Sequence, residues 1–282
     1  MLTRAPATLA GWIDAIRDAE IPVLARTVAA LDALRAKEDE VAPRDIAEAI
    51  RHDPLMTLKL FATISRERPA SRVTDTETVT ASLLMTGVSR FLRSVEAQAC
   101  VEDRLAAVPG ATDGLARVLR RSHRAARFAI GFALHRLDTD AEVIEEAALL
   151  HDFAEALLWC HAPGLALEIA RRQAADPALR SAQAQRDVLN VTLGGLEQAL
   201  MQAWRLPELL RRLTDHRPSC EPRVRNVMLA TALARHSQNG WSNPALPADV
   251  AALASLLNLS PTAVGSMIRS LDENAVDFAC PR

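Results

Sequence analysis

The sequence contains no tyrosine, and aromatic residues make up only 4% of its 282 residues. Strands favour aromatic and β-branched side chains, whereas the alanine, leucine, arginine and glutamate that dominate here favour helices. No segment alternates between apolar and polar residues with the period of two that a half-buried strand needs. The sequence therefore predicts an all-α protein.

An excess of charge of one sign is also missing, because 33 basic and 35 acidic residues give a formal net charge of -2. Such a chain has no overall field to draw it onto nucleic acid or an anionic membrane, so any binding of that kind must be local. With 49% hydrophobic and 24% charged residues, the composition is that of an ordinary globular protein.

The sequence has no C-x-x-C pair. Its four cysteines lie in unrelated flanking sequences, so their even spacing of 60 residues is interpreted as coincidence: Cys100, Cys160, Cys220 and Cys280. Scattered single cysteines suit a reducing cytosol better than a disulfide framework.

Long apolar runs that could serve as targeting or membrane segments are lacking. Near the N-terminus, Asp14, Arg17 and Asp18 stand where a signal peptide needs its apolar stretch. The longest uncharged run, 250–268, has the length of a membrane helix but holds asparagine, proline, glycine and several hydroxyl residues. We expect a cytoplasmic protein without a membrane segment.

Apolar periodicity divides the chain into helices. Pro43 and the pair Asp53-Pro54 mark helix starts, Gly87 splits two helices, and 66–76 is predicted as a loop. The string VPGATD suggests a boundary between an N-terminal helical lobe, 1–108, and a second lobe, 109–282. Further helices are expected at about 24–37, 115–135, 141–159, 164–174, 178–190, 193–204, 207–215, 222–237, 248–257 and 261–271.

The adjacent pair His151-Asp152 is the sharpest local motif. It falls inside the predicted helix 141–159, which is apolar over most of its circumference and is expected to be central. An imidazole and a carboxylate that differ by about 100° around a helix axis can bracket one metal ion, as in metal-dependent phosphohydrolases. A buried pair satisfied by its protein neighbours is the alternative interpretation.

Five blocks in order resemble the HDOD family, bacterial signalling proteins related to the HD phosphohydrolases. They lie between Glu20 and Pro218 and read IPVLARTVAALDAL, IAEAIRHDPLMTLKLFATIS, TVTASLLMTGVSRFLRSV, ALLHDFAEALL and LGGLEQALMQAWRLPELLRRLTDHRP. The tightest are the string DP-x-(L/M)-T-x-(K/R)-L and the ending W-x-LP. The resemblance implies a single HDOD-type domain over about 20–218, within a two-lobed all-α fold whose second lobe is a degenerate HD-like one.

The chain departs from that pattern at functional positions. Similar active phosphohydrolases follow the HD pair with a small and a basic residue, whereas Phe153, Ala154 and Glu155 follow here. Leu193 stands where the family often carries a histidine. No second carboxylate cluster is evident, so we expect no catalysis and no cofactor, with a residual divalent metal as an open alternative. The vestigial metal ligands would be His123, His151, Asp152 and His216.

Five arginines form what we call the arginine stripe, spaced so that most share one face of the predicted helix 115–135. The residues are Arg117, Arg120, Arg121, Arg124 and Arg127. A solvated face is one interpretation. An acceptor for phosphate or for an acidic partner surface is the other, because the guanidinium fork suits both.

The segment Val250 to Leu271 has the spacing of a helix-turn-helix. Its second helix offers Arg269 as the only basic residue, and Asp272 and Glu273 follow directly. A phosphate backbone needs more positive charge than this, so two closing core helices are the preferred interpretation and nucleic-acid binding is a weaker alternative.

Together these features predict a non-catalytic bacterial regulatory module that binds a protein partner in a signalling pathway. A metal-dependent phosphohydrolase acting on a nucleotide or phosphorylated ligand is the alternative from another functional class. Tightly bound metal would favour the enzyme. The sequence leaves the partner and the oligomeric state open.

Overall fold

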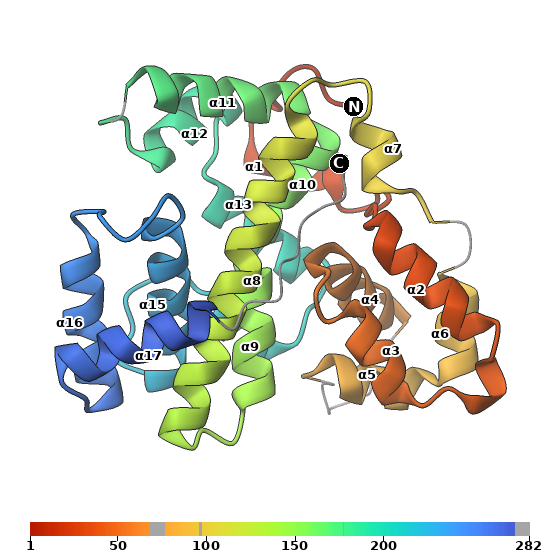
Figure 1. Ribbon diagram of the computed structural model, residues 1–282. Coiled ribbons are helices and arrows are strands. Elements are labelled where there is room, and N and C mark those ends of the chain that lie inside the picture. Colours follow the sequence, from red (N-terminus) through yellow and green to blue (C-terminus); the bar gives the residue numbers. More distant parts are fainter. Residues whose placement is uncertain (68–76, 96–97, 177, 274–282) are drawn as a thin grey trace. The chain divides into compact units, whose positions relative to one another are not determined.

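The computed structural model describes residues 1–67, 77–95, 98–176 and 178–273 (Figure 1). Every regular element in these ranges is a helix, and the one β contact among them is an isolated bridge between Val23 and Cys100. The all-α prediction is therefore confirmed. Cys280 and most of the predicted loop, 68–76, lie outside the described residues.

The chain forms two compact units. Unit 1 comprises Met1–Val118 and Asp152–Pro207, and unit 2 comprises Leu119–His151 and Glu208–Arg282. Unit 1 thus contains the later segment Asp152–Pro207 as well as the N-terminal part of the chain. The two units are therefore not separated by a single boundary such as the one predicted at residue 108. The helix α8 (Ala111–Arg136) contributes its first turns to unit 1 and the rest to unit 2.

The N-terminal part of unit 1 is a set of short helices joined by tight turns. Helix α3 packs on α2 and α5, and α4 packs on α5. Gly87, with φ 83°, separates α5 from α6, as the sequence predicts. The elements are α1 (Leu9–Ile16), α2 (Ala25–Arg35), the 3-10 helix Glu38–Glu40, α3 (Pro43–Ile50), α4 (Pro54–Glu67), α5 (Val79–Thr86), α6 (Val88–Ser94) and α7 (Val101–Leu105).

Helix α10 (Phe153–His161) is the centre of unit 1. All its residues except Glu155 are buried, and it packs against α4, α7, α11 and α13. The Trp12 indole of α1 donates to the carbonyl oxygen of Leu189 at 2.8 Å. The other helices of this part are α11 (Pro163–Ala175), α12 (Ser181–Leu189) and α13 (Leu193–Ala203).

The DP string of the sequence has a structural role in unit 1. One carboxylate oxygen of Asp53 accepts the backbone N–H groups of Leu55 and Met56, each at 3.0 Å, and so caps α4. The other oxygen accepts the N–H of Leu24 at 3.0 Å. Asp53 is buried, and this burial raises its pKa despite the bonds it accepts. The capping predicted from Asp53-Pro54 is confirmed.

Unit 2 packs its helices around α15. Helix α15 contacts α9, α14 and α16, and the Asn226 side chain on α15 donates to the carbonyl oxygen of Ala129 at 3.1 Å. A Cβ atom on Gly131 would lie 2.6 Å from Leu271, so the glycine allows α17 to approach α8. The helices are α9 (Ala141–Leu150), α14 (Glu208–Leu213), α15 (Pro222–His236), α16 (Leu246–Leu257) and α17 (Pro261–Glu273).

The single helix predicted over 141–159 is wrong in one respect. It is interrupted at the HD pair, where His151 ends α9 and Asp152, with φ -114° and ψ 22°, precedes α10. The chain also passes from unit 2 to unit 1 between these two residues. The regular offset of about 100° between neighbouring helical residues therefore does not apply to the pair.

Candidate functional site

The histidine of the HD pair packs against another predicted ligand of unit 2. His151 is buried, and its ring meets that of His216 edge-on, with the centroids 4.4 Å apart and an interplanar angle of 73°. His216 follows α14 and is exposed. Two of the four predicted ligands are thus brought together by α9 and by the turn after α14.

His123 does not complete this pair. It is buried on the part of α8 that belongs to unit 2. Among the described residues, no choice of one ring nitrogen from each of His123, His151 and His216 places all three within 4.8 Å of one another. Three imidazoles around one ion need such proximity, since zinc and similar metals bind nitrogen at about 2.0–2.1 Å.

The remaining predicted positions lie in unit 1. Asp152 is half-buried and its side chain does not cap α10. Glu155 is also half-buried, on the first turn of α10. Leu193 is a buried first residue of α13, whose N-terminus is capped by the Thr192 hydroxyl through the N–H of Gly195 at 3.2 Å. An apolar side chain, that of Leu193, therefore packs at the position where the resemblance implies a histidine.

Two buried carboxylates were missed by the sequence analysis. They are Glu146 on α9 of unit 2 and Glu197 on α13 of unit 1, with exposed fractions of 8% and 2%. For Glu197 the available signal was a single acid on an otherwise apolar face of α13, whereas Glu146 shares its face of α9 with Glu142 and gave no such signal. Acidic residues are seldom fully buried unless they are paired.

The arginine stripe does not form one solvated face. Arg124 donates two hydrogen bonds to the carboxylate of Asp272 on α17, at 2.8 and 3.0 Å, and one to the hydroxyl of Ser237 at 2.9 Å. Its guanidinium also lies 5.8 Å from the ring centre of Trp241. Arg124 therefore fastens α17 to α8 within unit 2.

The other members of the arginine stripe are either packed within unit 2 or exposed to solvent. Arg127 lies 3.8 Å from Asp272, and desolvation lowers its pKa. Arg121 is buried and reaches the side chain of Gln238 at 3.5 Å. Arg117 and Arg120 are exposed. The prediction of a partner or anion surface thus stays open for the two exposed arginines.

The segment with helix-turn-helix spacing does have that local geometry. Helices α16 and α17 meet at 100° across a short turn that begins at Asn258, whose φ is 53°. On α17, however, the guanidinium of Arg269 lies 6.0 Å from the ring centre of Trp241, and Asp272 binds Arg124. Little positive charge remains on α17 for a phosphate backbone.

In the described part of the chain, no single helix is long and apolar enough to cross a membrane. Helices α16 and α17 pass that test of length and composition only together, as a bent pair.

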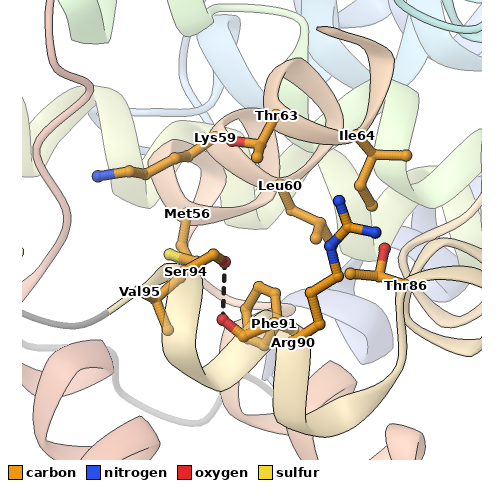
Figure 2. Close-up of a pocket in the computed structure, with 10 residues that line it drawn as sticks. All are labelled: Met56, Lys59, Leu60, Thr63, Ile64, Thr86, Arg90, Phe91, Ser94 and Val95. Atoms are coloured by element: carbon orange, nitrogen blue, oxygen red, sulfur yellow. Dashed lines mark hydrogen bonds between the residues drawn. The ribbon is translucent and has the colours of Figure 1, made fainter. Parts of the chain in front are cut away.

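Unit 1 contains a small apolar pocket between α4 and α6, with a volume of about 30 Å³ (Figure 2). Leu60 and Phe91 lie in its wall, and the guanidinium of Arg90 lies between Ile64 and Thr86. The hydroxyl of Ser94 donates to a carbonyl oxygen of its own helix at 2.7 Å. The pocket therefore has two cationic side chains, Lys59 and Arg90, in a mainly hydrocarbon wall.

Solved structures of other proteins share the fold of this chain. The MmoQ response regulator of Methylococcus capsulatus superimposes with a TM-score of 0.67 at 17% identity, covering 88% of this chain and 98% of that one. A virulence factor from Campylobacter jejuni superimposes with a TM-score of 0.62 at 18% identity, covering 95% and 100%. At these identities the likeness concerns the fold alone. A search of the curated proteins finds no match.

The family model described as HDOD domain matches residues 21–219, which is most of the chain and close to the span of about 20–218 expected from the five blocks. The chain belongs to the HDOD family.

Proposed function

We propose that this protein is a non-catalytic regulatory module that acts by binding a protein partner in a signalling pathway. The observation that carries the proposal is the set of residues around the HD pair: the acidic Glu155 follows the pair on α10, and the apolar Leu193 begins α13. A hydrolase of the HD type needs several ligands around a metal-bound water and a group that positions the water.

The residues after the HD pair support the same proposal. Glu155 replaces the basic residue that similar active enzymes carry, and Leu193 is a packing residue of α13. A carboxylate cannot supply the positive charge that would stabilise a phosphate in a transition state. The solved relative named as a response regulator agrees with a regulatory role.

The exposed members of the arginine stripe are our candidate contacts for an acidic partner. Arg117 and Arg120 lie on α8 and are exposed to solvent. Exposed arginines steer and orient an acidic partner, and their contribution falls as salt rises. We exclude Arg124 and Arg127 from this surface because both contact Asp272.

Hydrolysis assays test the non-catalytic part. We expect the purified full chain to turn over neither a generic phosphodiester nor nucleotides with added Mn²⁺ or Mg²⁺, and to hold no stoichiometric metal when purified without chelator. Turnover that Asp152→Ala abolishes, while circular dichroism shows the variant folded, would establish the phosphohydrolase alternative instead.

Partner capture tests the interaction part. The double variant Arg117→Glu/Arg120→Glu is expected to lose the proteins that the native chain retains at low salt, and Arg180→Glu is the matched control because Arg180 is exposed on unit 1. Equal capture by both variants would remove the two arginines from the proposal.

A separate experiment tests nucleic-acid binding. Retention of the native chain on duplex DNA, lost as salt rises, would favour DNA binding through α16 and α17.

A further inference from the structure

Three arginines of unit 1 line a second hollow, which is open to solvent and has a volume of about 410 Å³. Arg17 ends α1, Arg66 lies in the last turn of α4, and Arg205 follows α13. The wall also includes Asp18, Ser65 and Trp204. We propose that this hollow binds the phosphate group of a small phosphate monoester.

The proposal rests first on donors that the protein does not use. Arg17 binds the carboxylate of Asp18 through Nε and Nη2, at 3.1 and 2.9 Å. Arg66 uses Nη2, which donates to the carbonyl oxygen of Arg17 and lies 3.5 Å from Asp18. Nη1 of Arg17, Nε and Nη1 of Arg66 and the whole guanidinium of Arg205 have no partner among the described residues. Guanidinium forks match phosphate oxygens in a bidentate manner.

Charge balance selects the ligand class. Three guanidinium groups and the single carboxylate of Asp18 leave two positive charges around the hollow. A phosphate monoester carries about -1.5 to -2 charge at pH 7, because its second pKa is about 6. The hollow is also larger than one phosphate ion and falls in the size range of small-molecule sites, about 300–1,000 Å³.

The frame of the hollow is held by two hydrogen bonds to one backbone oxygen, that of Arg17. The indole of Trp204 is 1% exposed and donates to the carbonyl oxygen of Arg17 at 2.9 Å, so α1 and α13 are held together at this point. The same oxygen accepts the guanidinium of Arg66. A fixed frame lowers the entropy lost when a ligand is bound.

The backbone at Arg205 gives an independent observation. Arg205 has φ 54°, and the N–H groups of Arg205 and Leu206 donate to the carbonyl oxygens of Gln202 and Met201 at 3.1 and 3.0 Å. This is the Schellman ending of α13, in which glycine is usual at the left-handed residue. An arginine there places a guanidinium beside the hollow at the expense of backbone strain.

Calorimetric titration of the full chain with adenosine 5′-monophosphate and with inorganic phosphate tests the site. Both probes are expected to bind, more tightly as the pH rises through about 6, where the phosphate loses its second proton. Adenosine without phosphate is expected not to bind. Arg205→Gln and Arg66→Gln should each weaken binding about tenfold or more, since each removes a charge-assisted fork.

The matched control is Arg180→Gln, which removes an exposed arginine of unit 1 that does not line the hollow. It should leave binding unchanged. The proposal is overturned if neither phosphate probe binds below about 10 mM, or if Arg205→Gln and Arg66→Gln bind as tightly as the control. Loss of this site would leave the proposed partner binding through Arg117 and Arg120 unaffected, so the two proposals fail separately.

Discussion

Reversing the charge of Arg124 is expected to destabilise unit 2, although the residue belongs to a stripe that spacing alone treats as a solvated face. The side chains of Arg124 and Asp272 are 17% and 22% exposed, so their ion pair is partly desolvated. Arg124→Glu removes the bidentate contact and the bond to Ser237, and it brings two carboxylates together. We expect a loss of about 2–4 kcal/mol in the free energy of unfolding.

Arg120→Glu provides a control on the same helix. Arg120 is exposed, and arginine and glutamate have similar helix propensities, so its reversal should change the free energy of unfolding by less than about 0.5 kcal/mol. Urea unfolding followed by circular dichroism measures both variants, and an unchanged slope with a lower midpoint identifies a loss of stability. The double variant Arg124→Glu/Asp272→Arg should recover part of the loss, since it restores an ion pair. Equal midpoints for the two single variants would refute the role assigned to Arg124.

Three further predictions concern unit 1. Arg205→Gly should raise the free energy of unfolding by about 1 kcal/mol, because glycine adopts the left-handed conformation without strain; a lower urea midpoint would contradict this. Burial, followed by the nearby charge of Arg104, lowers the pKa of His161 from 6.5 to about 4. The unfolded chain therefore takes up this proton first, and stability should fall by about 2–3 kcal/mol as the pH drops from 6.5 to 4; His161→Asn should flatten that dependence in a series of urea unfolding curves. Gly114→Ala would place a Cβ atom 2.2 Å from the ring of Trp159, so overpacking should cost about 1–3 kcal/mol, seen as a lower thermal midpoint.

Periodicity predicted the helices well where one face is apolar. The long helix expected at about 115–135 is α8 (Ala111–Arg136), and the helix expected at 193–204 is α13 (Leu193–Ala203). It failed at the HD pair because a segment that is apolar nearly all round carries no periodic signal to mark an interruption. No glycine or proline stands there to indicate a break.

The arginine stripe shows a second limit of sequence spacing. Spacing tells which residues share a helix face, but the partner that packs on that face can come from any distance along the chain. Asp272 is 148 residues from Arg124 in sequence, and both it and Trp241 are brought to α8 by the packing of unit 2. A charged face was therefore predictable, whereas its division into packed and exposed arginines was not.

Residues of the two tightest family motifs stabilise the fold through hydrogen bonds. Asp53 caps α4 and holds the start of α2, while the Trp204 indole joins the end of α13 to the end of α1. Residues with such buried bonds cannot also recognise a partner, because their donors and acceptors are already used. We therefore expect recognition to depend on exposed groups that these hydrogen bonds do not use. Arg120 and Arg205 are such groups, and we expect the fold to persist when either arginine is reversed or removed.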